Sequence, residues 1–127
     1  MTKGMPKIEV VRVDNKERTD DFVTLPYSIY RDCEQYVPDL EFEVRDFINP
    51  AVNPSYEFAD IQPFVAYKDG EAVGRIIGIV NRKANERWHC KKVRFTMIEF
   101  VDDQKVAKAL IGAVEKWGKE RGMEEIE

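Results

Sequence analysis

Residues Val93 to Gly122 read VRFTMIEFVDDQKVAKALIGAVEKWGKERG, and this stretch decides the fold. Its first part, Val93 to Val101, is rich in β-branched and aromatic residues, which favour a strand. Apolar side chains first alternate as one face of a strand would, at Val93, Phe95 and Met97. The alternation breaks at Ile98-Glu99-Phe100, where two apolar residues flank a carboxylate. Either a strand buried on both faces or a β-bulge would explain the break.

The second part of this stretch predicts one long amphipathic helix. Asp102 and Asp103 stand where an N-cap accepts unpaired backbone N–H groups, and Gly122 follows the basic last turn as a helix stop. A strand that leads into a helix N-terminus is a place where anions can bind, but the same unit is also common as plain core structure. The apolar residues recur at three- and four-residue spacings and form one stripe: Val106, Ala109, Leu110, Ala113, Val114 and Trp117.

Composition places the chain among small globular proteins. Its 127 residues are 43% hydrophobic and 35% charged, which predicts one domain with a real core. The net charge of −4 gives no electrostatic reason to expect nucleic acid as a partner. We also expect no membrane partner and a cytoplasmic location, because no apolar run approaches the roughly 20 residues of a membrane span.

The sulfur and imidazole groups of the chain predict no metal site. Cys33 and Cys90 lie far apart and are expected to be reduced thiols, and one histidine without clustered ligands does not make a zinc site. His89 and Cys90 are adjacent, and neighbours on a strand point to opposite faces. We therefore interpret His89-Cys90 as part of a loop rather than as a base and a nucleophile.

The first half of the chain predicts one strand and one or two helices. Ile8 to Val13 alternates as a strand, and Asp14 can cap a helix that begins near Lys16. Pro26 lies inside the helical pattern and should kink or interrupt it. Leu40 to Ile48 suits either a helix or a strand.

The middle of the chain predicts a β-hairpin. Ile61 to Lys68 reads as a strand, in which Pro63 suits an edge or the strand's start. Lys68-Asp69-Gly70-Glu71 is a hairpin turn, and Ala72 to Asn81 returns. Gly74 and Gly78 on the returning strand leave room for close packing, and Asn81 to Glu86 is expected to be an exposed polar loop or turn. With the later strand, these segments predict an antiparallel meander with helices on its faces, an α/β sandwich.

This order of elements resembles the N-terminal part of the GNAT N-acyltransferase superfamily. The residues that carry the resemblance are Pro63 to Ile76, PFVAYKDGEAVGRI, in which a strand turns and returns as "G-x-x-V-G". Ile98 to Gly122 is similar to the fourth strand of that family and the long helix after it. The resemblance implies an α/β fold: a GNAT-like mixed sheet with flanking helices, lacking the C-terminal strands.

The resemblance also implies a binding site for acetyl-CoA or another acyl-CoA. In the family, the pantetheine arm pairs with the fourth strand, which corresponds here to Glu99, Phe100 and Val101. Glu99 is the candidate base, while Tyr30 and Tyr36 would either line the site of a small amine acceptor or pack in the core. The pyrophosphate loop corresponds to Gln104, Lys105, Val106, Ala107, Lys108 and Ala109.

The chain departs from the family's pattern at two points. Ala107 occupies the place of the middle glycine in the phosphate loop, beside the two carboxylates of Asp102 and Asp103. The chain stops at Glu127, where the family continues with a fifth strand, so residues 1–127 are expected to be one GNAT-like domain that is truncated on its C-terminal side. We expect a homodimer or larger assembly to cover the open strand edge. The function is either acyl-CoA-dependent N-acetyl transfer or that of a non-catalytic assembly module or fragment.

Overall fold

The computed structural model describes residues 7–29 and 41–126 of the chain. They form a sheet in the spatial order β1-β2-β3-β4-β5. The first four strands pair antiparallel as a meander, as predicted, and β5 joins β4 in parallel. The strands are β1 (Ile8–Arg12), β2 (Ala59–Lys68), β3 (Glu71–Asn81), β4 (Lys92–Phe100) and β5 (Glu125–Ile126).

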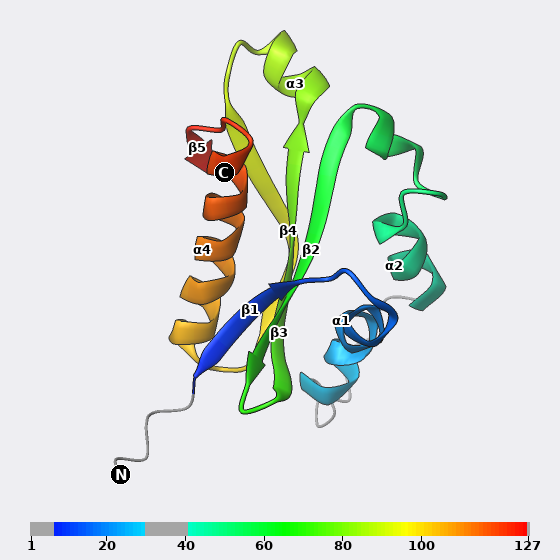
Figure 1. Ribbon diagram of the computed structural model, residues 1–127, viewed down its shortest axis with the longest axis vertical. Helices are drawn as coiled ribbons and strands as arrows, with labels where there is room; N and C mark the ends of the chain where they lie inside the picture. Colours follow the sequence, from blue (N-terminus) through cyan, green and yellow to red (C-terminus); the bar gives the residue numbers. More distant parts are fainter. Residues whose placement is uncertain (1–6, 30–40, 127) are drawn as a thin grey trace.

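Helices cover both faces of this sheet (Figure 1). One long helix lies against one face, two helices lie against the other, and a short helix stands at one end of the sheet. The order of layers is that of the predicted α/β sandwich. The helices are α1 (Lys16–Ile29), α2 (Glu41–Ile48), the 3₁₀ turn η1 (Pro54–Glu57), α3 (Arg82–Arg87) and α4 (Gln104–Glu120).

Close contact between α4 and β3 depends on the two glycines of β3. A Cβ atom at Gly74 would lie 2.8 Å from Val106 Cγ1, and one at Gly78 would lie 3.0 Å from the ring of Trp117. Only glycine allows this approach without displacement of the helix, so the predicted close packing is confirmed. The predicted stripe of α4 faces the sheet, with Val106, Leu110, Val114 and Trp117 fully buried.

The opposite face of the sheet packs against α1 and α2. Phe22 and Val23 of α1 share a buried cluster with Val65 of β2 and Ile77 of β3. The Tyr67 hydroxyl donates a hydrogen bond of 2.5 Å to Asp21, which joins β2 to α1. Burial, with help from that carboxylate, raises the pKa of Tyr67 above its ordinary value, so the phenol keeps its proton and remains a donor.

A β-bulge at Met97 resolves the broken alternation of β4. Arg75 pairs with Glu99 and Ile77 pairs with Thr96, so β4 carries one extra residue between these pairs. Met97 has the positive φ of 51° at this point and packs on the α1 side, whereas Phe95 packs on the α4 side. The prediction that Val93, Phe95 and Met97 share one face is therefore wrong at Met97. The hairpin turn is confirmed, with positive φ at both Asp69 and Gly70.

Two local expectations from the sequence need correction. Residues Arg82–Arg87 form the helix α3 rather than a loop, and Asn81 caps it by accepting the N–H of Ala84. Asn15, not Asp14, caps α1, because its Oδ1 accepts the N–H of Arg18 at 2.8 Å. Asp14 instead pairs with the Arg18 guanidinium at 2.9 Å.

The helix α1 runs through Pro26 to Ile29 without interruption. A proline at this position has no N–H for the carbonyl of Phe22, four residues earlier. That carbonyl accepts a hydrogen bond of 2.8 Å from Arg75 Nη1 of β3. The helix therefore continues because a side chain of the sheet satisfies the group that Pro26 leaves unpaired.

Pro63 lies within β2, between two neighbouring strands, yet its missing N–H disturbs no ladder. The N–H of Val13, just past the end of β1, donates to the Pro63 carbonyl at 3.0 Å. The nitrogen and the carbonyl of one residue in an antiparallel strand point toward the same neighbouring strand. The nitrogen of Pro63 therefore points toward β1, which ends at Arg12, one residue before Val13. Because β2 is an interior strand and Pro63 lies in its middle, the prediction that Pro63 marks an edge or the strand's start is wrong.

Some expectations lie outside the described residues, namely those for Cys33, Tyr30 and Tyr36. Leu40 to Ile48 is a helix over its described part, Glu41–Ile48. His89 and Cys90 lie in the turn after α3, as predicted, with the Cys90 thiol 3.5 Å from Asn85 Oδ1. Over residues 7–29 and 41–126, every helix is too short or too polar to cross a bilayer.

Candidate functional site

The candidate site lies where β4 ends and α4 begins. The N–H of Val101 still bonds to the carbonyl of Val73 on β3, at 2.9 Å. Asp103, two residues further on, is already the N-cap of α4. The strand thus passes into the helix within three residues, as its sequence predicted, and brings backbone of the β4 edge next to the first turn of α4.

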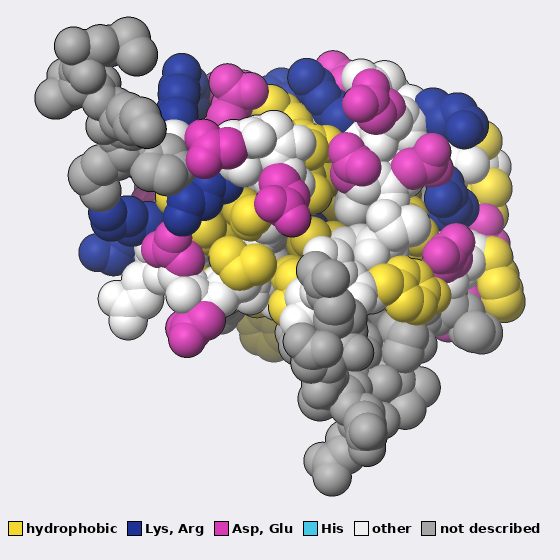
Figure 2. All heavy atoms as spheres, turned by 90° about the horizontal axis from the view of Figure 1, so that it is seen from below, with side chains coloured by type: hydrophobic (Ala, Val, Ile, Leu, Met, Phe, Trp, Pro, Cys, Tyr) yellow, Lys and Arg dark blue, Asp and Glu magenta, His cyan; other side chains and the backbone are white. Residues whose placement is uncertain are grey.

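Side chains of both charges surround the start of α4. Asp103 Oδ1 accepts the N–H of Lys105 at 2.9 Å, and Asp103 Oδ2 lies 3.3 Å from the Lys68 ammonium. The backbone N–H of Lys105 holds the pKa of Asp103 below its ordinary value, and Lys68 adds to the effect. Asp103 is therefore a carboxylate at neutral pH. Figure 2, which views this end of the molecule, shows Asp and Glu side chains interspersed with Lys and Arg side chains around apolar ones.

The six residues that correspond to a phosphate loop all lie in the first two turns of α4. Val106 is fully buried and fills the space over Gly74. Polar groups reach solvent from only one side of these turns, and the two alanines are half-buried. The exposed polar side chains are Gln104, Lys105 and Lys108.

Glu99, the candidate base, faces α1 rather than α4. Its Oε2 lies 2.8 Å from Nη2 of Arg75, the residue paired with it on β3. The Arg75 side chain is almost fully buried, and 18% of the Glu99 side chain is exposed. Glu99 is therefore held in a buried ion pair that opens toward solvent on the carboxylate side, and Phe100 faces the α4 cluster behind it.

Arg75 is the site residue that sequence reasoning missed. Its guanidinium binds Glu99, donates to the Phe22 carbonyl that Pro26 leaves unpaired, and lies 5.0 Å from the centre of the Phe22 ring. One signal was present: Arg75 is the only charged residue in AVGRIIGIV. A charge at the centre of an apolar strand requires a buried partner, although its identity depends on pairing between distant segments.

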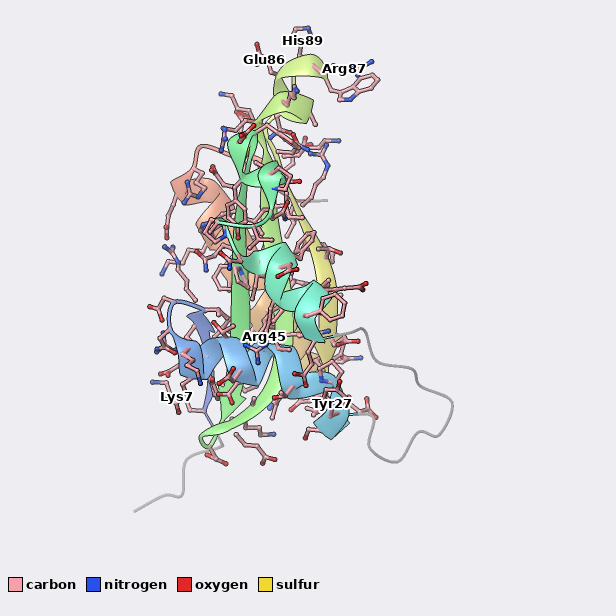
Figure 3. The ribbon with its side chains drawn as sticks, turned by 90° about the vertical axis from the view of Figure 1, so that its right-hand side faces the viewer. Lys7, Tyr27, Arg45, Glu86, Arg87 and His89 are labelled. Carbon is pink, nitrogen blue, oxygen red and sulfur yellow. The ribbon has the colours of Figure 1, made fainter. Side chains whose placement is uncertain are left out.

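A pocket of about 620 Å³ lies away from this site, between α1, α2 and the start of β2. Val13, Tyr56 and Pro63 line it, together with Arg45 of α2. Figure 3 shows Arg45 next to α1, where its guanidinium pairs with Asp20 at 2.8 Å. None of the residues predicted for catalysis or cofactor binding lines this pocket.

Two relatives align with most of the chain. Protein YghO of Escherichia coli is 35% identical over 112 residues, which are 88% of this chain and 28% of that protein. A bacterial ceramide synthase of Caulobacter vibrioides is 28% identical over 116 residues, which are 91% of this chain and 30% of that protein. The chain thus spans less than a third of the length of each of these relatives.

Solved acetyltransferases share the fold. The aminoglycoside N-acetyltransferase AAC(6′)-Iy in complex with CoA superposes with a TM-score of 0.63 and 19% identity, covering 99% of this chain and 78% of that one. The model of the acetyltransferase (GNAT) family matches residues 24–127, which include β2, β3, β4 and α4. With this match over most of its length, and with the meander, the bulged β4 and the helix α4 in the order that the resemblance implied, the chain belongs to the acetyltransferase (GNAT) family.

Proposed function

We propose that residues 1–127 form one domain that binds acyl-CoA for transfer of the acyl group to an amine. The observation that carries the proposal is the outer edge of bulged β4, which leads directly into the start of α4. Among the described residues, only Lys92 and Val93 of β4 pair with β5. The edge from the bulge to Val101 would then pair with the extended arm of the cofactor, as the family resemblance implies.

Three exposed side chains of α4 would hold the phosphate groups of the cofactor. Lys105 and Lys108 supply positive charge, and Gln104 supplies amide donors. The fit is partial, because Asp103 already accepts the N–H of Lys105 and Val106 is part of the core. A bound acyl-CoA supplies the thioester whose carbonyl carbon the amine attacks.

Glu99 would accept the proton that the amine loses. The ion pair with Arg75 fixes the carboxylate in one position, which is what a general base needs in order to act on a bound amine. A relative named a bacterial ceramide synthase supports an amine as acceptor and an acyl chain longer than acetyl, since a ceramide is an amide of a fatty acid. We therefore propose to test both a short and a long acyl-CoA.

A second candidate function is that of a non-catalytic assembly module. Asp103 favours it, because its carboxylate occupies a helix N–H that an incoming phosphate would otherwise bind. In this case the β4 edge would pair with protein instead of cofactor, in a homodimer or larger assembly.

Thermal unfolding with CoA, acetyl-CoA or palmitoyl-CoA tests the proposal. A ligand at about 100 times its dissociation constant adds about 2.7 kcal/mol to the stability of the folded state, so Tm should rise by several degrees. Lys105→Ala should reduce the rise. Lys116→Ala, an exposed lysine further along the same helix, should leave it unchanged.

The two candidate functions predict different results. If no acyl-CoA raises Tm at millimolar concentration, the acyl-CoA proposal is wrong and the assembly module remains. If Tm rises equally in Lys105→Ala and in the unaltered chain, the cofactor binds elsewhere than at the start of α4.

A further inference from the structure

Positive charge is concentrated at one end of this acidic protein. Residues 81–94 contain six lysines or arginines and one carboxylate, a net charge of +5 with His89 neutral. The net charge of −4 for the whole chain therefore divides into +5 for this segment and −9 for the remainder. We call residues 81–94, which comprise the end of β3, the helix α3, the turn after it and the first residues of β4, the basic tip.

Nearby carboxylates neutralise part of this charge, since Arg82 pairs with Asp60 and Lys91 lies 3.8 Å from Glu124. The acidic end of the molecule is too far away to neutralise the rest. Asp69, Glu71, Asp102 and Asp103 lie at the other end of β3 and β4. The 11 residues of β3 separate the two ends by about 35 Å, whereas interactions between exposed charges at physiological salt are largely screened beyond about 8 Å. A charged partner that approaches α3 therefore meets Lys83 and Arg87, whose cationic groups lie over the rings of Phe58 and Trp88.

The basic tip also exposes aromatic surface. The Trp88 side chain is 69% exposed, and the Arg87 guanidinium lies 5.7 Å from the centre of its ring. One turn earlier on the same face of α3, the Lys83 ammonium lies 5.4 Å from the centre of the Phe58 ring. The two cation–aromatic pairs border a hollow of about 340 Å³. Figure 3 shows Arg87 and His89 at the extremity of the molecule.

The basic tip is held in place by buried contacts. Asn85 is the buried residue of α3, and its amide donates to the carbonyl of Lys92 at 2.9 Å. Asn81 caps the helix, and Arg82 pairs with Asp60 of β2. Trp88, Lys83 and Arg87 are thus presented on a fixed support.

We propose that the basic tip docks the protein on the surface of an anionic lipid bilayer. Lys83 and Arg87 would contact the lipid phosphates and carboxylates, while the Trp88 indole would enter the interfacial layer, where a ring with an apolar body and a polar N–H is favoured. Docking of this kind takes place at the bilayer surface and does not require acyl transfer, so the proposal is independent of the proposed function.

A bilayer fits this surface better than a nucleic acid does. Nucleic-acid affinity comes from a row of phosphate contacts along the strand. Here Lys83 and Arg87 border one hollow beside the exposed indole of Trp88 at an extremity, which suits a flat partner that the tip can enter. The acidic opposite end would face away from the lipid.

Vesicle binding of the full 127-residue chain tests the proposal. Vesicles of phosphatidylcholine with about one-third phosphatidylserine should bind the chain at about 0.1 M salt, and should release it at about 1 M salt. Each basic residue near an anionic surface strengthens binding by about fivefold, so Lys83→Gln with Arg87→Gln should weaken it by about 25-fold. Lys7→Gln with Lys16→Gln makes the same change in net charge on exposed residues outside the basic tip, and should change binding less than twofold.

Tryptophan fluorescence gives a second readout. The chain has two tryptophans, and Trp117 is already buried with 1% exposure, so a blue shift on binding would come from Trp88. Trp88→Phe should abolish the shift. Equal binding to vesicles of phosphatidylcholine alone, or equal weakening by both double variants, would overturn the proposal. So would an emission shift with single-stranded RNA and none with vesicles, which would assign the surface to nucleic acid.

Discussion

At the scale of single residues, Arg75 links three parts of the chain that are distant in sequence. Its guanidinium pairs with Glu99 of β4 and donates a hydrogen bond to the carbonyl of Phe22 in α1. Pro26, four residues further along α1, leaves that carbonyl without its helical donor. The buried guanidinium is tolerated because it gains an ion pair, a hydrogen bond and an aromatic ring together. The loss of Arg75 would therefore affect α1 and β4 at once.

We predict that Arg75→Leu lowers the free energy of unfolding by about 3 kcal/mol, the lower end of the range for breaking a buried ion pair, because Glu99 is partly exposed. Glu99 and the Phe22 carbonyl both lose their contacts with the guanidinium in this variant. Urea unfolding measures the loss. The double variant Arg75→Leu with Glu99→Leu should recover part of it, since no charge is then left behind.

Arg12→Leu is the matched control for this measurement. Arg12 pairs with Glu120 at 2.6 Å, but the two side chains are 47% and 48% exposed. A pair of this kind contributes about 0–1 kcal/mol. Equal costs for Arg75→Leu and Arg12→Leu would show that the ion pair of Arg75 is not a buried one in solution.

At the scale of elements, the contact between α4 and β3 is set by the missing side chain of Gly74. A methyl group there would lie 2.8 Å from Val106 Cγ1 and 2.9 Å from Leu110 Cδ1. Both atoms belong to fully buried side chains, which have no free space to move into. We predict that Gly74→Ala lowers the stability by about 1–3 kcal/mol, with a lower Tm in thermal unfolding.

Gly112 provides a comparison, because its substitution by alanine is expected to raise the stability rather than lower it. It lies inside α4, and a Cβ atom there would meet no other atom within 4 Å. Gly112→Ala should therefore raise the stability by about 0.5–1 kcal/mol, because alanine loses less backbone entropy in a helix. A rise in Tm for both alanine variants would contradict the close approach of α4 to β3.

Elements with a long, regular pattern could be predicted from the sequence, and those defined by distant contacts could not. The stripe of α4 and the Asp-Gly hairpin are local signals, so both were predicted. The helix α3 has six residues, too few for helical periodicity to separate it from a polar loop. The pairing of Glu99 with Arg75 depends on the register of β4 against β3, which the broken alternation at Met97 left ambiguous.

At the scale of the whole molecule, the outer edge of β4 is the feature that can bind a partner through backbone hydrogen bonds. Beyond Lys92 and Val93, the described part of the chain places no strand beside it. An edge that the described strands leave open, with half-buried apolar side chains, favours pairing with another chain. If the second candidate function holds and no cofactor pairs with this edge, we predict a homodimer that uses it.

Light scattering coupled to size exclusion measures the mass directly. We expect a mass twice the 14.8 kDa of the chain at micromolar concentration. The variant with Lys83→Gln and Arg87→Gln should keep that mass, because both residues lie on α3 and not on the β4 edge. A monodisperse monomer over the whole range of concentrations would refute the dimer.

The bulge in β4 has a consequence for the comparison of related sequences. The pairs Arg75–Glu99 and Ile77–Thr96 are two residues apart on β3 but three residues apart on β4. The strand β4 therefore contains one extra residue between them. A related chain with a single deletion at this point would keep a strand of similar composition but would present its glutamate to the helix on the other face. In alignments of such chains, a one-residue gap between these pairs would therefore matter more than many substitutions, because it decides whether the glutamate and the arginine can meet.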